Sequence, residues 1–570
     1  MALNAFRRLP KVRPTEFFAA IVFIAGTIWF PADGYAKNTL VIGIRQYPAN
    51  FHPSIELTSA KTYVLGLARR PLTAFDSNWR LVCMLCERLP TIENGLARIE
   101  KSVGKNGAVS DGIAATFTLP QQATWGDGTP ITSDDVVFTW QAGRHLQSGF
   151  GKRSLFERIT RIDVVDSKTF TLHFGAVTFD FNDLGEFRLL PAHIERPIFE
   201  RDPALYRANT AYDTDTGNPG LYFGPYVISD AARDSHIVLT RNPKWWGKKP
   251  YFDRIVVKAI GDTAALQANL LSGDVDMIAG ELGLTVENAG ALQRSYPDRF
   301  NIVYQPGLLY EHIDVNLDNP ILRDKNVRQA LLDGMDRTAI DHALFEGRQE
   351  VAHSFVSASD GMFDPTTRKY CHDAARAAQL LDGAGWKMSA DGLRRNAAGE
   401  PLRVEVITTA GHRARQRVLL AIQDQWRKIG VETVIRYQTP RELFGVTLLR
   451  RQFPMMVMYA FNETPEMVPG TFLGSSQIPS ADNNYSGFNT TGFRSTRVDQ
   501  LIKELETTLD RGKRRQMFGA LQHIYADELP ALPLFFYSLP YILPKWLKGV
   551  EPTGHQFPST LWAENWYEER

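Results

Sequence analysis

Residues 415–437 constrain the fold more strongly than any other segment, because three structural signals follow one another there. Apolar residues up to Trp426 recur at helical spacing and predict an amphipathic helix. Gly430 stands where helices commonly end on a left-handed residue. Alternating residues up to Tyr437 then predict a strand. A helix, a glycine and a strand in succession indicate an α/β lobe.

Similar patterns along the rest of the chain mix strands with helices. Short, largely apolar runs predict strands at residues 40–44, 115–119, 169–174 and 255–258. Helical spacing predicts helices at residues 263–271, 498–509 and 513–526. At 570 residues the chain is too long for a single hydrophobic core, so two or more lobes are expected.

The first 36 residues carry the pattern of a secretory signal peptide. Four basic residues precede an apolar stretch at residues 17–30, which is shorter than the roughly 20 residues of a membrane span. Gly34 and Ala36 then predict cleavage between Ala36 and Lys37. No cysteine lies near this point, so we expect a periplasmic protein without a lipid anchor. An uncleaved membrane anchor is the alternative.

Charge and motifs exclude several classes of function. The whole chain carries +1 and the signal segment +2, so the mature protein is close to neutral, which argues against nucleic-acid binding. No GxxxxGK[ST], GxSxG or HExxH motif occurs, so nothing indicates an enzyme. The histidines lack close ligand spacing, and no metal or other cofactor is expected.

Cys83 and Cys86 form a CxxC pair in the mature chain. A redox role requires a thiol at a helix N-terminus, and this segment lacks that context. We expect buried free thiols, with a local disulfide as the alternative that an oxidising compartment favours. Cys371 and His372 are too small a ligand set for zinc.

Residues 125–140, W-G-D-G-T-P-I-T-S-D-D-V-V-F-T-W, predict a tight turn, an extended link and a capped helix. Gly126 and Gly128 suit the turn, and Thr132 with Asp135 forms a capping-box pattern. The segment resembles the F-x-D-G-x-P-x-T-A-x-D-V signature of the family 5 extracellular solute-binding proteins. These are the peptide, oligopeptide and nickel receptors of ABC importers.

Other blocks resemble the same family and follow in its order. They are the strand and N-P turn at residues 39–53, G-P-Y at 224–226 with L-T-R-N-P-K-W-W at 239–246, L-S-G-D-V-D at 271–276, the V-R-Q-A-L and M-D-R segments at 327–337, and L-L to G-W at 380–386. The resemblance implies an α/β, two-lobe periplasmic binding protein of type II, in the large cluster with an extra subdomain in lobe I. A hinge and an interlobe cleft are expected.

The resemblance also implies boundaries and a role. Lobe I is expected at residues 37–305, with the extra subdomain at about 76–200, lobe II at 306–529, and a return to lobe I at 530–570. The implied function is capture of di- or oligopeptides and their delivery to the permease and ATPase subunits of an ABC importer, by a monomer. The alternatives are a receptor for a nickel chelate, haem or another small solute, and a periplasmic peptide sensor or chaperone without a transporter.

Peptide receptors of the family commonly hold the ligand's α-ammonium with a buried Asp in a W-x-x-D-x-x-x-P segment. Here Tyr459 stands near the tryptophan and Asn462 at the Asp, while Glu463 is adjacent. A desolvated cation needs a desolvated partner, and Glu463 can supply the carboxylate. A solvated loop charge is the alternative for Glu463.

Further candidate ligand contacts are aromatic walls, amide donors and residues of loops that face the cleft in relatives. For the rings of Tyr459, Phe461 and Tyr485, burial in the core is the alternative. Arg328 and Arg337 are expected to be structural. The further candidates are Phe461, Tyr485, Asn484, Tyr47, Asn50, Phe51 and Tyr310.

Overall fold

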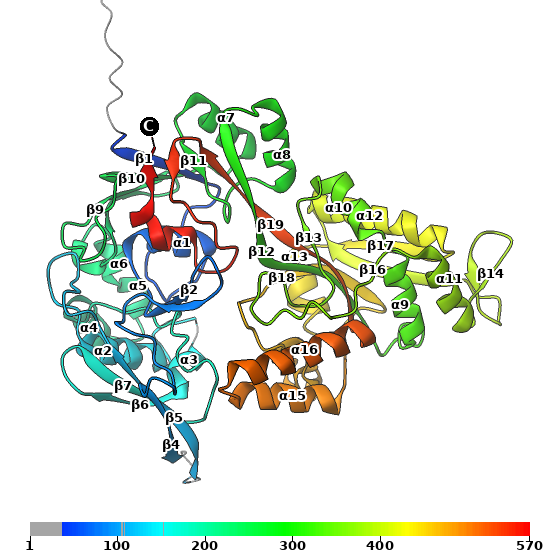
Figure 1. Ribbon diagram of the computed structural model, residues 1–570, viewed down its shortest axis with the longest axis horizontal. Coiled ribbons are helices and arrows are strands. Elements are labelled where there is room, and N and C mark those ends of the chain that lie inside the picture. The colour runs from blue at the N-terminus through cyan, green and yellow to red at the C-terminus, as the bar shows by residue number, and fades with distance from the viewer. Residues whose placement is uncertain (1–36, 104–106, 108, 152, 570) are drawn as a thin grey trace, which may run out of the picture. The chain divides into compact units, whose positions relative to one another are not determined.

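The computed structural model describes residues 37–103, 107, 109–151 and 153–569 (Figure 1). The predicted signal peptide lies outside these ranges. From Asn38 onward the chain forms one compact unit. Within this described part, no helix combines the length and the apolar character that a bilayer crossing needs.

A large mixed sheet runs through the unit, with parallel and antiparallel neighbours. Its strands, in spatial order, are β17 (Glu432–Gln438), β16 (Arg403–Thr409), β18 (Met456–Asn462), β12 (Phe300–Val315), β19 (Ala531–Pro544), β11 (Met277–Ile278), β1 (Thr39–Ile44), β10 (Arg254–Ala259), β9 (His236–Arg241) and β8 (Tyr226–Ala232), with β13 (Glu350–Val351) beside β19.

The long strands β12 and β19 pair with each other in the middle of this sheet and reach two different cores. Ile313 of β12 is buried with residues of β16 and β18, whereas Tyr541 of β19 is buried with residues of β1 and β10. The register of the pair shifts between Pro306 and Tyr310. Proline has no N–H to donate to a ladder, so Pro306 interrupts the pairing at this shift.

Smaller sheets complete the strand inventory. The separate four-stranded sheet places β4 (Ala97–Val103), β5 (Val109–Thr118), β7 (Thr169–Phe174) and β6 (Ile159–Val164) in that order. The two-stranded pairs are β2 (Thr73–Phe75) with β3 (Leu81–Cys83), β14 (Lys387–Met388) with β15 (Arg394–Arg395), and β20 (Leu547–Lys548) with β21 (Tyr567–Glu568).

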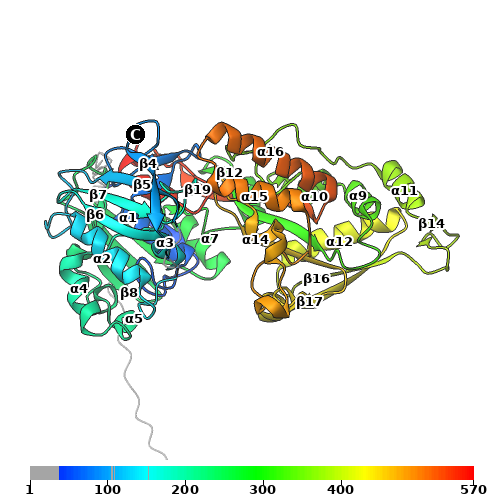
Figure 2. The same ribbon diagram turned by 90° about the horizontal axis from the view of Figure 1, so that it is seen from below.

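Helices of very different length connect the strands, and α15 and α16 pack side by side (Figure 2). The helices are α1 (Ser59–Ala68), α2 (Ser133–Arg144), α3 (Arg153–Arg158), α4 (Ala192–Arg201), α5 (Tyr206–Asn209), α6 (Ala211–Thr214), α7 (Thr263–Ser272), α8 (Val286–Ser295), α9 (Lys325–Asp333), α10 (Arg337–Phe345), α11 (Ala374–Gly383), α12 (Arg413–Lys428), α13 (Pro440–Glu442), α14 (Gly470–Leu473), α15 (Thr496–Thr507) and α16 (Arg511–Glu528). The short turns are η1 (Pro219–Leu221), η2 (Leu443–Thr447), η3 (Ser475–Gln477), η4 (Ala481–Asn483) and η5 (Ser559–Asn565).

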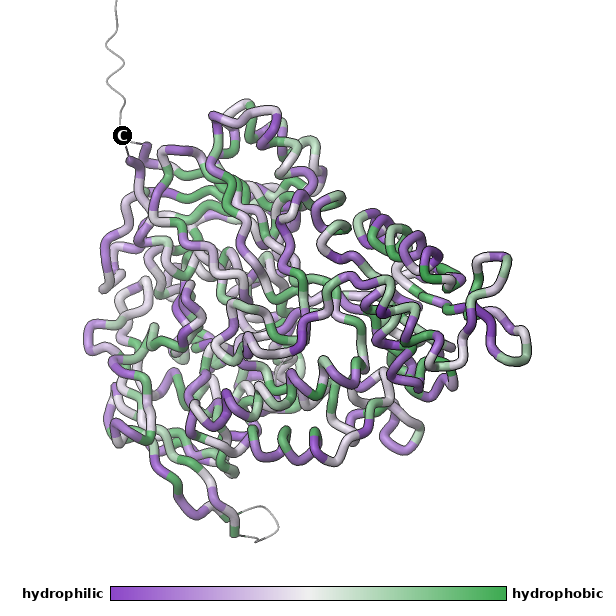
Figure 3. Tube along the Cα trace, turned by 45° about the vertical axis from the view of Figure 1, so that its right-hand side comes forward, coloured by the Kyte–Doolittle hydropathy of each residue, from purple (hydrophilic) through white to green (hydrophobic). Residues whose placement is uncertain are grey.

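Local sequence signals place these elements well. The segment β16, α12, β17 forms a parallel β-α-β unit, and Gly430 adopts a φ of 84° at its turn. Trp426 is fully buried on the apolar face of α12. Hydrophobic and hydrophilic residues alternate along the helical traces, as amphipathic helices require (Figure 3). Thr132 and Asp135 form both hydrogen bonds of the predicted capping box.

Candidate functional site

A cavity of about 1000 Å³ lies among the described residues. Ligand pockets of about 300–1000 Å³ are typical of small-molecule sites. Its walls come from segments that are far apart in sequence. They are Phe75, Arg80, Leu81, Leu89, Thr91, Ile92, Glu93, Arg158 and residues 176–183 on one side, and residues 464–468, Glu506, Thr507, Leu509, Arg511 and Arg514 on the other.

The two walls touch each other at Phe179. Its N–H donates to the carbonyl of Glu506 at 3.0 Å, and the Arg514 guanidinium lies over its ring at 5.0 Å. Glu466 accepts hydrogen bonds from Arg511 at 2.6 Å and from Arg514 at 3.5 Å. Glu466, Arg511 and Arg514 of this wall therefore already have protein partners.

Glu463 comes directly after β18 and directly before the wall residues 464–468. Its N–H donates to the carbonyl of Leu308 at 3.0 Å, and only 6% of the residue is exposed. The Oε1 atom is buried and has no hydrogen-bond partner among the described residues. Burial, with Asp360 and Glu350 nearby, raises the pKa of Glu463 well above its ordinary value.

The two neighbouring carboxylates are better satisfied. Asp360 accepts the N–H groups of Met362 at 2.7 Å and Glu466 at 2.8 Å, and burial raises its pKa to about 6. Glu350 accepts from the Ser357 hydroxyl and the Ala358 N–H, and burial raises its pKa as well. Glu463 is thus a buried carboxylate in acidic surroundings whose Oε1 atom has no hydrogen-bond partner among the described residues.

The candidate rings Tyr310, Tyr459 and Phe461 come together around His312. The Tyr459 hydroxyl donates to Asp314 at 2.8 Å. The three rings line a cavity of only about 20 Å³, which has room for about one water. The structure places them in a packed core, which was the alternative raised for Tyr459 and Phe461.

Other candidates of this half lie apart from the rings. Asn462 ends β18 opposite Leu309 and is exposed. Asn484 and Tyr485 follow η4 with φ angles of 51° and 55°. Arg450 lies over the Tyr485 ring at 5.2 Å.

The candidates near the N-terminus have internal partners. Phe51 is buried and contacts Tyr47 edge to face, with ring centroids 6.2 Å apart. The Asn50 side chain donates to Glu56 at 3.1 Å and accepts from Lys61 at 2.8 Å. Within the described ranges, none of the ten candidates lines the large cavity.

The cavity wall at residues 176–183 was not among the sites predicted from the sequence. This wall belongs to a long connection between β7 and α4 that contains no helix or strand of its own. A connection of this length inside a compact domain is often functional, and that signal is present in the sequence.

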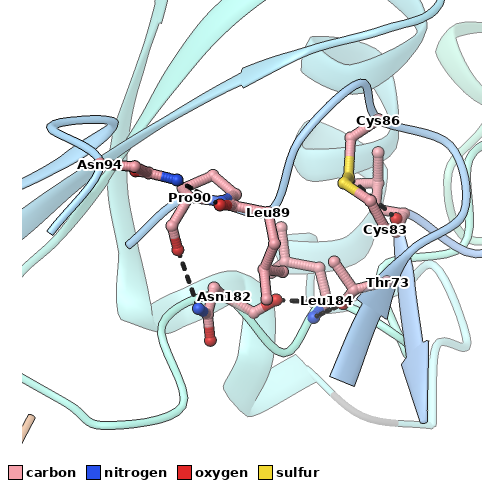
Figure 4. The surroundings of a disulfide bond; sticks show 9 residues. Thr73, Cys83, Cys86, Leu89, Pro90, Asn94, Asn182 and Leu184 are labelled. Atoms are coloured by element: carbon pink, nitrogen blue, oxygen red, sulfur yellow. Dashed lines mark hydrogen bonds between the residues drawn. A yellow bond between two sulfur atoms is a disulfide. The ribbon is translucent and has the colours of Figure 1, made fainter. Parts of the chain in front are cut away.

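The expectation of free thiols at Cys83 and Cys86 is wrong, because the structure joins them in a disulfide (Figure 4). The chain turns after β3 and brings their Cα atoms to 5.3 Å, within the range that a disulfide spans. Beside this bond, the Asn182 amide donates to the carbonyl of Pro90 at 2.8 Å. The disulfide therefore stabilises the chain next to the cavity wall. Cys371 is free and exposed.

Most of the chain matches a known protein family. Residues 105–480 match the family model described as bacterial extracellular solute-binding proteins, family 5 Middle. The chain belongs to this family. The oligopeptide-binding protein AppA of Bacillus subtilis (strain 168) is 24% identical over 529 residues, which cover 90% of this chain and 88% of AppA.

Solved structures of the family share the fold. The oligopeptide-binding protein of Thermus thermophilus, complexed with a pentapeptide, is 26% identical, with a TM-score of 0.67 and coverage of 93% of this chain and 96% of that one. NikZ of Campylobacter jejuni, in complex with Ni(L-His), is 21% identical, with a TM-score of 0.69 and coverage of 94% and 100%. The predicted family and its two-lobe, type II α/β fold are confirmed.

Proposed function

We propose that this protein captures peptides in the periplasm and delivers them to the permease and ATPase subunits of an ABC importer, as a monomer. The observation that carries the proposal is the cavity of about 1000 Å³ between residues 176–183 and residues 464–468. This volume suits a short peptide, and its walls mix apolar, charged and main-chain groups. Relatives named as oligopeptide-binding proteins cover the chain almost fully and support the choice of ligand.

The lobe boundaries of this proposal are residues 37–305 and 530–570 for lobe I, with an extra subdomain at about 76–200, and 306–529 for lobe II. Two observations support a hinge near Pro306 of β12, which pairs with Ser538 of β19. The pairing of β12 with β19 shifts register at Pro306, and opposite ends of these strands enter different cores. Closure about such a hinge couples ligand binding to recognition by the transporter.

Glu463 is the proposed anchor for the peptide's α-ammonium. Its buried, unpartnered Oε1 atom would gain the charged partner that it lacks. Asn462, Tyr485, Asn484, Tyr47 and the remaining candidates stay proposed contacts of an opened or ligand-bound form. Glu463 lies between the end of β18 and residues 464–468 of the cavity wall.

A thermal-shift screen tests the proposed ligand class. Peptides should raise the melting temperature of the purified protein, because a ligand that binds only the folded state stabilises it. Native mass spectrometry of the purified protein should show a co-purified peptide. If peptides leave the melting temperature unchanged and a nickel chelate raises it, the proposed ligand would be a chelate and not a peptide.

The anchor is tested with a matched pair of variants and a matched pair of peptides. Glu463→Gln should weaken binding of free-amine peptides much more than binding of their N-acetylated forms. The control Glu442→Gln alters an exposed glutamate of α13 and should change neither. Equal losses for both peptide forms would show that Glu463 does not meet the amine.

The location is tested by intact mass. Cleavage after Ala36 predicts a periplasmic species that begins at Lys37, free of lipid. A membrane-bound species that retains Met1 would overturn the proposed processing.

A further inference from the structure

A second, smaller cavity of about 50 Å³ lies between α1, the loop at residues 185–188 and the segment at 557–561. Three arginines line it: Arg69 and Arg70 directly after α1, and Arg188. Phe557 and Leu561 supply an apolar side. No acidic residue lines this cavity.

The three arginines differ in how their charges are balanced. Arg70 forms an ion pair with Glu564 at 2.6 Å, and Arg188 forms one with Glu186 at 3.2 Å. Within the part of the chain that the structure describes, no carboxylate lies within ion-pair distance of Arg69. The site as a whole therefore has one buried positive charge in excess.

Arg69 is 6% exposed. Its side chain is held in place by protein contacts, but these do not use all of its hydrogen-bond donors. Its guanidinium donates to the carbonyl of Leu189 and lies over the Phe223 ring at 5.3 Å. Its Nε atom is buried and has no hydrogen-bond partner among the described residues. Arg188 also reaches the carbonyl of Pro53 at 2.7 Å, which fixes a second guanidinium near the cavity.

Buried arginines elsewhere in the chain show what a purely structural role looks like. Arg337 is 3% exposed and donates to the carbonyls of Ala352, Pro533 and Tyr370. Arg328 is 4% exposed and donates to carbonyls on both sides of its helix. No nitrogen of either side chain is among the fully buried atoms without a hydrogen-bond partner in the described structure. Arg69 differs from both, because it lines a cavity and keeps a free donor.

We propose that this arginine-lined cavity binds a carboxylate group of the ligand, with Arg69 as the principal contact and Arg188 as the second. The planar guanidinium matches the two oxygens of a carboxylate, and the apolar side strengthens the pairing by excluding water. The volume exceeds that of several waters and admits a carboxylate. This inference rests on the proposed peptide ligand and deepens it. The carboxylate can be the peptide's C-terminus or an acidic side chain.

Three peptides distinguish the two sources by calorimetric titration: trialanine, trialanine amide and Ala-Glu-Ala amide. A C-terminal source predicts that trialanine binds at least tenfold more tightly than its amide. A side-chain source predicts that Ala-Glu-Ala amide binds at least tenfold more tightly than trialanine amide. Either preference should disappear in Arg69→Met and shrink in Arg188→Gln, while the affinity for trialanine amide stays unchanged.

Arg144→Gln is the control, because this arginine stacks on Trp140 of α2 and does not line the cavity. It should keep the full preference. Melting curves establish that each variant is folded, and Arg188→Gln, whose side chain is partly exposed, serves if Arg69→Met does not fold. No preference in the unaltered protein, or a preference that survives both variants, would overturn the site.

A second measurement separates this inference from the proposed function. Sodium acetate should raise the melting temperature saturably above that in sodium chloride of equal ionic strength. The rise should be absent in Arg69→Met and present in Arg144→Gln. If acetate acts in this way but no peptide binds, the anion site stands and the peptide proposal fails. If peptide amides bind, but acetate does not raise the melting temperature and a carboxylate does not increase peptide affinity, the anion site fails and the peptide proposal stands.

Discussion

Two buried carboxylates, one on β12 and one directly after the neighbouring strand β18, differ in their partners. Glu311 of β12 is fully buried and receives Arg415 through two hydrogen bonds, at 2.5 and 2.9 Å. Arg415 also donates to the Thr409 hydroxyl at 2.8 Å. Glu463, after β18, is buried to nearly the same degree, yet its Oε1 atom has no partner in the described structure.

The difference teaches how to separate structural from functional charges here. A buried charge costs several kcal/mol unless it is paired, so an unpaired one must be offset by the rest of the fold. The Glu311–Arg415 pair ties α12 to β12 and leaves no group for a ligand. Glu463 keeps an unused acceptor at the margin of the large cavity. Two buried arginines show the same contrast for positive charges: Arg337 donates to protein carbonyls, whereas the Nε atom of Arg69 has no partner among the described residues.

The largest expected effect comes from breaking the satisfied pair. Arg415→Met leaves the Glu311 carboxylate buried without a partner and should lower the free energy of unfolding by about 3–5 kcal/mol. Urea denaturation followed by circular dichroism measures this. The control Arg417→Met removes a surface pair with Glu287, in which both side chains are about half exposed, and should cost less than about 1 kcal/mol.

Replacing both partners sharpens the same test. The double variant Glu311→Leu, Arg415→Met removes the orphaned charge and should recover most of the loss. A single variant as stable as the unaltered protein would show that Glu311 finds another partner, and the comparison with Glu463 would lose its reference.

Local signals explain which parts of this structure the sequence predicts. The α12 helix, Gly430 and β17 follow one another in the chain, so spacing alone locates them. The capping box at Thr132 is equally local. The disulfide was missed because it depends on how the chain turns after β3, and the CxxC spacing is compatible with free thiols too.

The site depends on distant segments, which explains why less of it could be predicted. The Glu463 position came from a family pattern, but its raised pKa depends on burial and on the charges of Asp360 and Glu350, about a hundred residues earlier. The large cavity joins residues 176–183 with residues 506–514, and no local pattern connects them. Rings such as Tyr459 looked equally suited to a cleft and a core, because both environments select aromatic residues.

Asp360 is intermediate between the paired Glu311 and the unpartnered Glu463. It accepts hydrogen bonds from two N–H groups, but the described residues include no ion-pair partner for it. Burial raises its pKa to about 6 in the folded protein, from an ordinary value of 3.8. Below pH 4 both states are protonated and its contribution to stability is fully present. As the pH rises through 6, the folded state must ionise a buried group, and up to roughly 3 kcal/mol is lost.

The Asp360→Asn variant isolates this effect, because the amide does not titrate. The free energy of unfolding of the variant, minus that of the unaltered protein, should increase between pH 4 and pH 6.5 and be level above pH 7. Chemical denaturation across this range measures the difference. A difference that does not change with pH would mean that Asp360 ionises as easily folded as unfolded.

The smallest expected effect is a gain in stability at Glu463. Glu463→Gln removes a buried carboxyl group whose raised pKa makes its ionised form costly in the folded protein, so without ligand it should raise the free energy of unfolding at pH 7.5 by about 1–2 kcal/mol. Glu442→Gln, at an exposed position, should change it by less than about 0.5 kcal/mol. With a free-amine peptide at about 100 times its Kd, the unaltered protein gains roughly 2.7 kcal/mol. The order of stability then reverses, because the amide of the Glu463→Gln variant offers the ammonium no charge. If Glu463→Gln is less stable without ligand, the carboxylate has an internal partner after all and belongs with Glu311.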